Sequence, residues 1–174
     1  MLNIFVNTWG NYNENGGDGG EWITLPMDGE ELKEALNKIA AAMGDNDPEW
    51  AIHDYEWVTE IDLREISELE SIKKLNEELQ ELDGLSEWDQ KEIAAAMEAF
   101  GYSFQEAYDR QQRGCFIFYA DQHLDDVAEE IADEWLDSNN VPSTIRNYFD
   151  YSAFARDLGF DGYTETSYGV ILDN

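Results

Sequence analysis

Acidic residues outnumber basic residues by four to one in this sequence, with 40 Asp and Glu against 10 Lys and Arg and a formal net charge of −30. The excess is not confined to a tail. Residues 1–60 carry 13 acids and 2 bases, residues 61–102 carry 12 and 4, and residues 103–174 carry 15 and 4. Any fold of this chain must therefore place like charges close together on its whole surface. Such a surface would repel bare nucleic acid and anionic membranes, so neither is expected as a partner.

The chain nevertheless has enough apolar residues to build a core. Hydrophobic residues make up 43% of the sequence and aromatic residues 13%, which argues against disorder. The single cysteine, Cys115, excludes an intramolecular disulfide and every multi-cysteine metal site, and its apolar neighbours predict a buried structural thiol. Residues 1–7 do not resemble a signal peptide, and no apolar stretch approaches the roughly 20 residues of a membrane span. These features predict a cytoplasmic protein.

Residues 1–60 have the periodicity of a small mixed module in the order strand, strand, helix, strand. A polar, Gly-rich loop at residues 10–20 is expected to join the first two strands. This loop lacks the Lys and Ser/Thr of a phosphate-binding loop and does not lead into a helix. The helix is predicted from Asp28, which with Glu31 resembles a capping box, to Gly44. The strands are predicted at residues 2–9, 21–25 and 50–58.

Residues 61–102 change to a purely helical pattern. Apolar side chains step by three or four residues from Ile66 to Leu82, and Gly84 is expected to end that helix. Ser86 is expected to cap a second helix that runs towards Phe100. Short connections predict antiparallel helices in a small bundle.

Residues 103–174 return to mixed structure. A helix capped by Ser103, an apolar strand at 115–120, a helix capped by Asp121 and a short helix capped by Asp150 precede a hairpin at 162–172. The sequence therefore predicts an elongated α+β protein with three small modules in series. These are a β-rich mixed module at 1–60, a helical bundle at 61–102 and a mixed α/β module at 103–174.

The helix after Asp121 separates apolar and acidic residues most clearly. No Lys or Arg occurs from Asp121 through Val141, and five pairs of acids are spaced i,i+4. Each such pair costs about 0.2–0.5 kcal/mol, or roughly 1–2.5 kcal/mol in total, against a typical stability of about 5–15 kcal/mol. A cost of this size indicates a role for the charges beyond solubility. The predicted buried stripe is Leu124, Val127, Ala128, Ile131, Ala132 and Trp135.

Charge spacing suggests what that role is. Carboxylates at i,i+4 lie about 6 Å apart along a helix, comparable to neighbouring phosphates on one strand. Duplex DNA carries one charge per about 1.7 Å of axis, so 30 charges correspond to about 15 base pairs or 50 Å. A compact globule of this length is only about 40 Å across, so the modules would have to be strung out. A head-to-head dimer would extend the charge to about 30 base pairs. We therefore predict a protein that imitates DNA.

The predicted partner-binding residues are the outward acids of the two most regular helical segments. Neither a catalytic site, a cofactor nor a metal site is predicted. The acids are Glu65, Glu68, Glu70, Glu77, Glu78 and Glu81 in the first segment, and Asp125, Asp126, Glu129, Glu130, Asp133, Glu134 and Asp137 in the second.

Three other interpretations of the acidic composition are halophilic adaptation, a calcium site and an acid-rich enzyme. Halophilic adaptation also produces acidic surfaces and stays open on composition alone. A calcium loop starting at Asp45 is rejected, because the Gly needed at its sixth position is missing and Pro48 lies in its turn. An enzyme is disfavoured, because His53 and His123 lack metal-ligand spacing and no nucleophile motif is present.

Several segments resemble one known family. Residues 8–14 (TWGNYNE), 20–25 (GEWITL) and 50–56 (WAIHDYE) are similar to the opening strands of the ArdA antirestriction proteins. Residues 148–158 (YFDYSAFARDL), followed by Asp-Gly-Tyr at 161–163, give the most specific similarity. The resemblance extends over nearly the whole chain, and the middle helical region is similar in character.

The resemblance implies a dimeric, elongated mimic of bent B-form DNA, encoded on a mobile element. Such a protein occupies the DNA-binding groove of type I restriction–modification enzymes and protects incoming DNA. The alternative class is a DNA mimic aimed at another DNA-binding protein, such as a nucleoid protein or a repressor.

Overall fold

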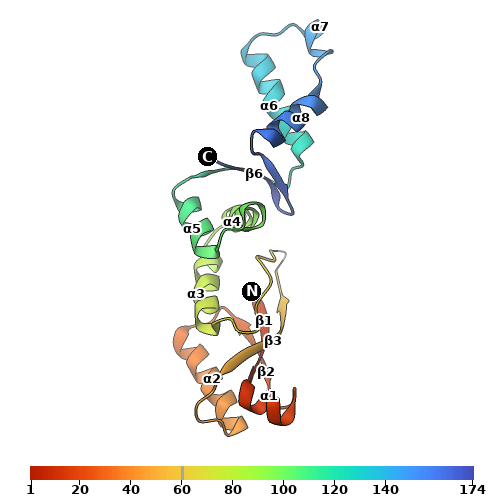
Figure 1. Cartoon of the computed structure of the whole chain (residues 1–174). Helices are drawn as coiled ribbons and strands as arrows, with labels where there is room; N and C mark the ends of the chain where they lie inside the picture. The colour runs from red at the N-terminus through yellow and green to blue at the C-terminus, as the bar shows by residue number, and fades with distance from the viewer. Residues whose placement is uncertain (60) are drawn as a thin grey trace. The chain divides into compact units, whose positions relative to one another are not determined.

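The computed structural model describes residues 1–59 and 61–174 (Figure 1), so the module boundary predicted at Glu60 lies outside the described residues. The chain separates into two compact units, Met1–Ser86 and Glu87–Asn174. Each contains helices and one three-stranded antiparallel sheet, which confirms the predicted α+β class. The elongated arrangement in three modules stays a prediction. Among the described helices, none combines the length and apolar character required to cross a membrane.

The first unit is built on a sheet with strand order β2-β1-β3. Alternate residues of β1 point to the buried side, where Leu2, Ile4 and Val6 are fully buried. Asp28 and Gly44 cap the ends of α2 as predicted. The elements are β1 (Leu2–Thr8), α1 (Trp9–Asn15), β2 (Glu21–Leu25), α2 (Gly29–Met43), β3 (Trp50–Trp57) and α3 (Ile72–Asp83).

The loop predicted at residues 10–20 contains a helix instead, α1. The Thr8 hydroxyl accepts a hydrogen bond from the Asn11 amide at 3.2 Å and so caps the helix. The buried Asn7 side chain accepts from Asn11 and donates to the carbonyl of Gly16, which ties both ends of α1 together. Tyr12 then stacks on His53 of β3, with ring centroids 4.2 Å apart. These side-chain hydrogen bonds stabilise α1 in a segment whose high glycine content had predicted a loop.

The helix predicted to begin near Ile66 begins only at Ile72. Its cap is Ser71, whose hydroxyl accepts from the Lys74 amide. The preceding residues form no regular element in the described structure but bury Ile66, while the carbonyl of Glu68 accepts from the Ile52 amide at 3.0 Å. The apolar spacing before Ile72 therefore does not reflect a helix: Ile66 is buried in a segment without regular structure, and Leu69 is 73% exposed.

The second unit has a sheet with strand order β4-β6-β5. The caps predicted at Ser103 and Asp150 and the terminal hairpin are all present. The elements are α4 (Glu87–Phe100), α5 (Phe104–Gln112), β4 (Phe116–Ala120), α6 (Leu124–Ser138), α7 (Ser143–Arg146), α8 (Tyr151–Phe160), β5 (Thr164–Thr166) and β6 (Gly169–Asp173).

Helix α6 differs from its prediction at two points. It begins at Leu124 with His123 as N-cap, because Asp121 has a left-handed backbone (φ 57°) that helical residues do not adopt. Trp135 was expected in the buried stripe but is 57% exposed. The buried side of the helix packs instead through Ala128 against Ala155 and Leu158 of α8.

Glu92 of α4 is a carboxyl group inside the second unit, only 5% exposed. Burial raises the pKa of Glu92 to about 7; a hydrogen bond with Gln111 opposes this rise and the nearby charge of Asp89 adds to it. The folded protein therefore holds a proton on Glu92 at pH values where the unfolded chain has released it. The contribution of Glu92 to the free energy of unfolding is therefore fully present below about pH 4.3 and is lost as the pH rises towards 7.

We predict that Glu92→Gln stabilises the protein at pH 8 by up to roughly 3 kcal/mol and has little effect near pH 4.5. The amide keeps the shape of the carboxyl group but needs no proton. Urea unfolding of the wild type and the variant at both pH values measures the difference, with Glu81→Gln, an exposed site, as the matched control. An equal effect of Glu92→Gln at both pH values would contradict the raised pKa of Glu92.

Candidate functional site

The outer face of α6 is the most strongly charged helical surface of the second unit. Its buried stripe against α8 fixes which residues point outward. Asp133 is half-buried and accepts a hydrogen bond from the Tyr151 hydroxyl at 2.6 Å. The other six predicted acids are exposed: Asp125, Asp126, Glu129, Glu130, Glu134 and Asp137.

Most of these acids have no compensating cation. Asp137 pairs with Arg146 of α7, and the Asp126 carboxylate accepts from the backbone amide of His123. Asp125, Glu129, Glu130 and Glu134 form neither an ion pair nor a hydrogen bond within the described residues. The structure thus brings together a row of unneutralised carboxylates on one helix, as the sequence predicted.

The start of α6 is held by contacts from the adjacent sheet. Glu165 of β5 accepts from the Leu124 amide at 2.9 Å, and its other oxygen lies 2.8 Å from Nδ1 of His123. This hydrogen bond raises the pKa of His123, while the same bond and the Leu124 amide lower the pKa of Glu165. Lys91 of α4 binds Asp121 just before the helix, at 2.8 Å. A carboxylate at the N-terminus also complements the helix dipole, so this end of α6 is anchored despite its charge.

At the opposite end of α6, Arg146 is the one compensating cation among the described residues. No basic residue occurs in its last turn, and Glu134 and Asp137 lie where the helix dipole is negative. The repulsion predicted from the sequence is therefore present in the folded helix and is relieved at this end only by Arg146.

The first predicted group of acids lies in a different environment. Arg64 contacts both Glu70 and Glu78, with its Nη2 3.0 Å from the Glu78 carboxylate. The two glutamate side chains are only 15% and 11% exposed, and the hydrogen bond from Arg64 lowers the pKa of Glu70. The expectation that Glu70 and Glu78 point outward as free charges is wrong, because Arg64 pairs with both carboxylates and Lys74 also pairs with Glu78.

The remaining members of this group are also partly compensated. Glu77 pairs with Lys73 at 3.7 Å, and Glu68 lies 3.0 Å from Nδ1 of His53, a contact that is an ion pair only with a protonated imidazole. Only Glu65 and Glu81 lack an ion pair within the described residues. Since α3 begins at Ile72, Glu65, Glu68 and Glu70 precede the helix on which they were expected.

Two exposed acids on β3 were not selected from the sequence. Asp54 and Glu56 alternate with half-buried residues and project from one face of the first sheet. The period-two alternation at residues 53–57 was the signal that could have found them.

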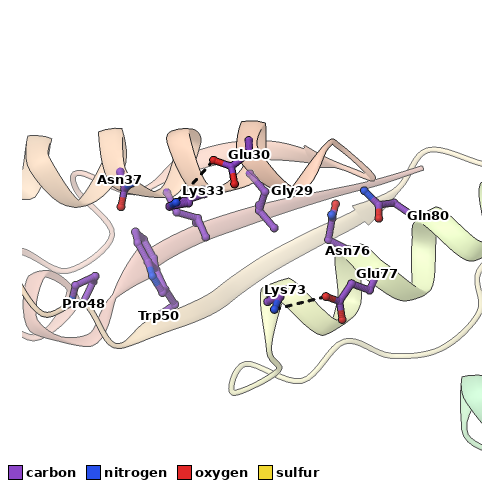
Figure 2. Close-up of a pocket in the computed structure, with 12 residues that line it drawn as sticks. Gly29, Glu30, Lys33, Asn37, Pro48, Trp50, Lys73, Asn76, Glu77 and Gln80 are labelled. Carbon is purple, nitrogen blue, oxygen red and sulfur yellow. Dashed lines mark ion pairs between the residues drawn. The ribbon is translucent and has the colours of Figure 1, made fainter.

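A groove of about 530 Å³ is lined by residues of α2 and α3, with Trp50 in its wall (Figure 2). Its charges cancel in two pairs, Lys33 with Glu30 and Lys73 with Glu77, each at 3.7 Å. The Asn76 side chain both accepts from and donates to the backbone of Met27. These groups hold elements of the first unit together and form no nucleophile–base pair. In the part of the chain that is described, no cluster of three or more His, Cys, Asp or Glu could hold a metal ion.

Comparison with known proteins gives one assignment. The family described as Antirestriction protein (ArdA) matches residues 4–172, nearly the whole chain. A search of curated proteins finds no match. The family match agrees with the segments in which the sequence resembled that family. The chain therefore belongs to the ArdA family of antirestriction proteins.

Proposed function

We propose that the protein inhibits type I restriction–modification enzymes by imitating B-form DNA and occupying their DNA-binding groove. The observation that carries this proposal is the row of unneutralised carboxylates along α6, held on a helix whose first turn is anchored by Glu165 and whose buried side packs on α8. Successive carboxylates at i,i+4 are about 6 Å apart, which suits a groove built to bind phosphates. The activity is competitive occupation, and it requires neither a catalytic group nor a cofactor.

Repulsion within α6 supports a functional role for these charges. A helix that only needed to be soluble would gain stability from an occasional Lys or Arg at i,i+4. In contrast, the first unit places Arg64, Lys73 and Lys74 beside its acids. Among the thirteen predicted acids, those of α6 are therefore the stronger candidates for direct contact with a basic groove.

A pull-down from a host lysate tests the class of partner. Recovery of restriction–modification subunits, displaced by duplex DNA, is the expected result. Recovery of a nucleoid protein or a repressor alone would contradict the proposed target. DNA mimicry would then be directed at the recovered protein.

We predict that replacing Asp126, Glu130 and Glu134 together with Asn or Gln weakens binding to the enzyme at least tenfold, about 1.4 kcal/mol. The same variant should unfold at higher denaturant, because two repulsive i,i+4 pairs are removed, each costing about 0.2–0.5 kcal/mol. Competition with labelled DNA and urea unfolding measure the two effects. No single substitution in the set should abolish inhibition, since binding is distributed over many contacts.

The matched control for this variant removes the same charge elsewhere. Glu14, Glu34 and Glu106 are exposed and lie outside α6, so their joint replacement with Gln keeps the net charge equal to that of the α6 variant. Equal losses of binding in both variants would contradict a specific role of α6 and leave only net charge as the cause.

We also propose that the protein is a homodimer, and unit 2 offers an apolar surface for the contact. Trp135 is 57% exposed, Ile145 59% and Tyr148 88%. They lie on α6, on α7 and just after α7, and Trp135 also borders an apolar hollow of about 230 Å³ together with Phe149 and Phe154. Phe116 and Phe118, in contrast, are buried in the core.

Sedimentation at low micromolar concentration should show a species of twice the 20.0 kDa chain mass. Replacing Trp135 and Tyr148 with Ala should shift it towards the monomer, because interfaces depend on exposed aromatic anchors. A wild-type protein that sediments only as a 20.0 kDa species would contradict the dimer.

A further inference from the structure

The first sheet has a face that does not belong to the core of its unit. Phe5 in the central strand β1 pairs with Trp22 of β2 on one side and with Asp54 of β3 on the other. The next row on this face places Asn3 between Thr24 and Glu56. Residues directly opposite one another on antiparallel strands interact through their side chains, so the aromatic pair and the two carboxylates are neighbours.

Trp22 is the exposed member of the aromatic pair, and it packs on the half-buried Phe5. Trp22 is 52% exposed, and its ring centroid lies 5.5 Å from that of Phe5. Gly20 leaves room for the Phe5 ring, since a Cβ there would overlap the ring and lie 2.9 Å from the Val6 carbonyl oxygen. In the second row, the Thr24 hydroxyl donates to the Asn3 side chain at 2.7 Å. The face is therefore an ordered surface with a half-exposed indole.

This face carries negative charge without any Lys or Arg. The sequence has neither residue before Lys33, nor between Lys38 and Arg64, so none of the three strands contains one. Asp54 and Glu56 are exposed and form no ion pair with the described residues, although Asp54 accepts from the adjacent Tyr55 amide at 2.8 Å. An aromatic surface bordered by free carboxylates complements a planar cation, because the plane can stack on the rings while the positive charge lies beside the carboxylates.

We propose that this sheet face docks an arginine-bearing segment of a DNA-binding protein, with the guanidinium over Trp22 and Phe5 and its N–H groups directed to Asp54 and Glu56. The inference rests on the proposed function for the class of partner. Arginine stacks on aromatic rings and donates a fork of hydrogen bonds to carboxylates, whereas the lysine ammonium is a compact, strongly hydrated charge.

A second copy of this chain does not fit as the occupant. A copy placed on this face would bring a mostly acidic surface against the exposed carboxylates of Asp54 and Glu56, and like charges across an interface are unfavourable. The proposed dimer contact instead uses the exposed apolar residues Trp135, Ile145 and Tyr148. The basic surface that a DNA mimic must meet supplies the complementary charge.

The direct test is an NMR titration of the full chain with two peptides of equal charge, hexa-arginine and hexa-lysine. The indole N–H signal of Trp22, assigned with Trp22→Phe, should shift more with the arginine peptide than with the lysine peptide. It should also shift more than the signal of Trp88, which is 47% exposed and lies on α4, outside both proposed contact surfaces. A Trp22 response no larger than that of Trp88, or equal for both peptides, overturns the inference.

Paired variants locate the carboxylates in the same experiment. Asp54→Asn with Glu56→Gln should reduce the Trp22 shift severalfold, while Glu81→Gln with Asp83→Asn, an equal loss of charge at two other exposed sites, should leave it nearly unchanged. An equal reduction by both pairs would mean general electrostatic attraction and would contradict the site.

Inhibition of the restriction enzyme separates this inference from the proposed function. Trp22→Ala should weaken inhibition about tenfold, and Trp22→Phe should restore most of it, because a phenyl ring keeps part of the cation–π contact. If the wild type fails to inhibit while Trp22 responds selectively to hexa-arginine, the proposed function is wrong and the docking face stands. If the wild type inhibits and Trp22→Ala does so equally, the docking face is wrong and the proposed function stands.

Discussion

Repulsion between carboxylates is the constraint on which the rest of this structure depends. With 40 acids and 10 bases, the fold cannot neutralise its surface, so the position of each base matters. Four of them pair with acids beyond the next helical turn: Arg64 binds Glu70 and Glu78, Lys91 binds Asp121, Arg110 binds Asp173, and Arg146 binds Asp137. Such ion pairs contribute little each when exposed, but here they also lower the repulsion at junctions between elements. The apolar cores supply the remaining stability.

This use of the bases leaves the acids of α6 largely uncompensated. The helix remains folded because its N-terminus is bound by Glu165 and its buried residues pack on α8. Under the proposed function, its outer face is an array of charge on a preformed helix, so the backbone has little conformational entropy left to lose on binding a basic groove. The open face of the first sheet adds aromatic surface beside its acids. Together these features suit a protein that binds through many distributed contacts rather than through one pocket.

Local sequence signals predicted much of the fold but few of the long-range contacts. The helix caps at Asp28, Ser103 and Asp150 could be read from the sequence because capping depends on residues within three positions. The total charge likewise predicted an acidic surface. Which carboxylates are free could not be predicted, since Arg64 reaches Glu78 from fourteen residues away. The exposed Trp135 was misassigned because a helical stripe shows spacing but not where the neighbouring helix ends.

The central claim is that carboxylates take the place of phosphates in a basic groove, and its most direct test is the salt dependence of two quantities. Between about 0.05 and 0.5 M NaCl the screening length falls from roughly 14 Å to 4 Å. The account predicts that the association rate with the target falls steeply over this range, because long-range attraction is screened. The unfolding temperature of the free protein should rise over the same range as repulsion among its acids is relieved. An association rate that does not change with salt would contradict the account.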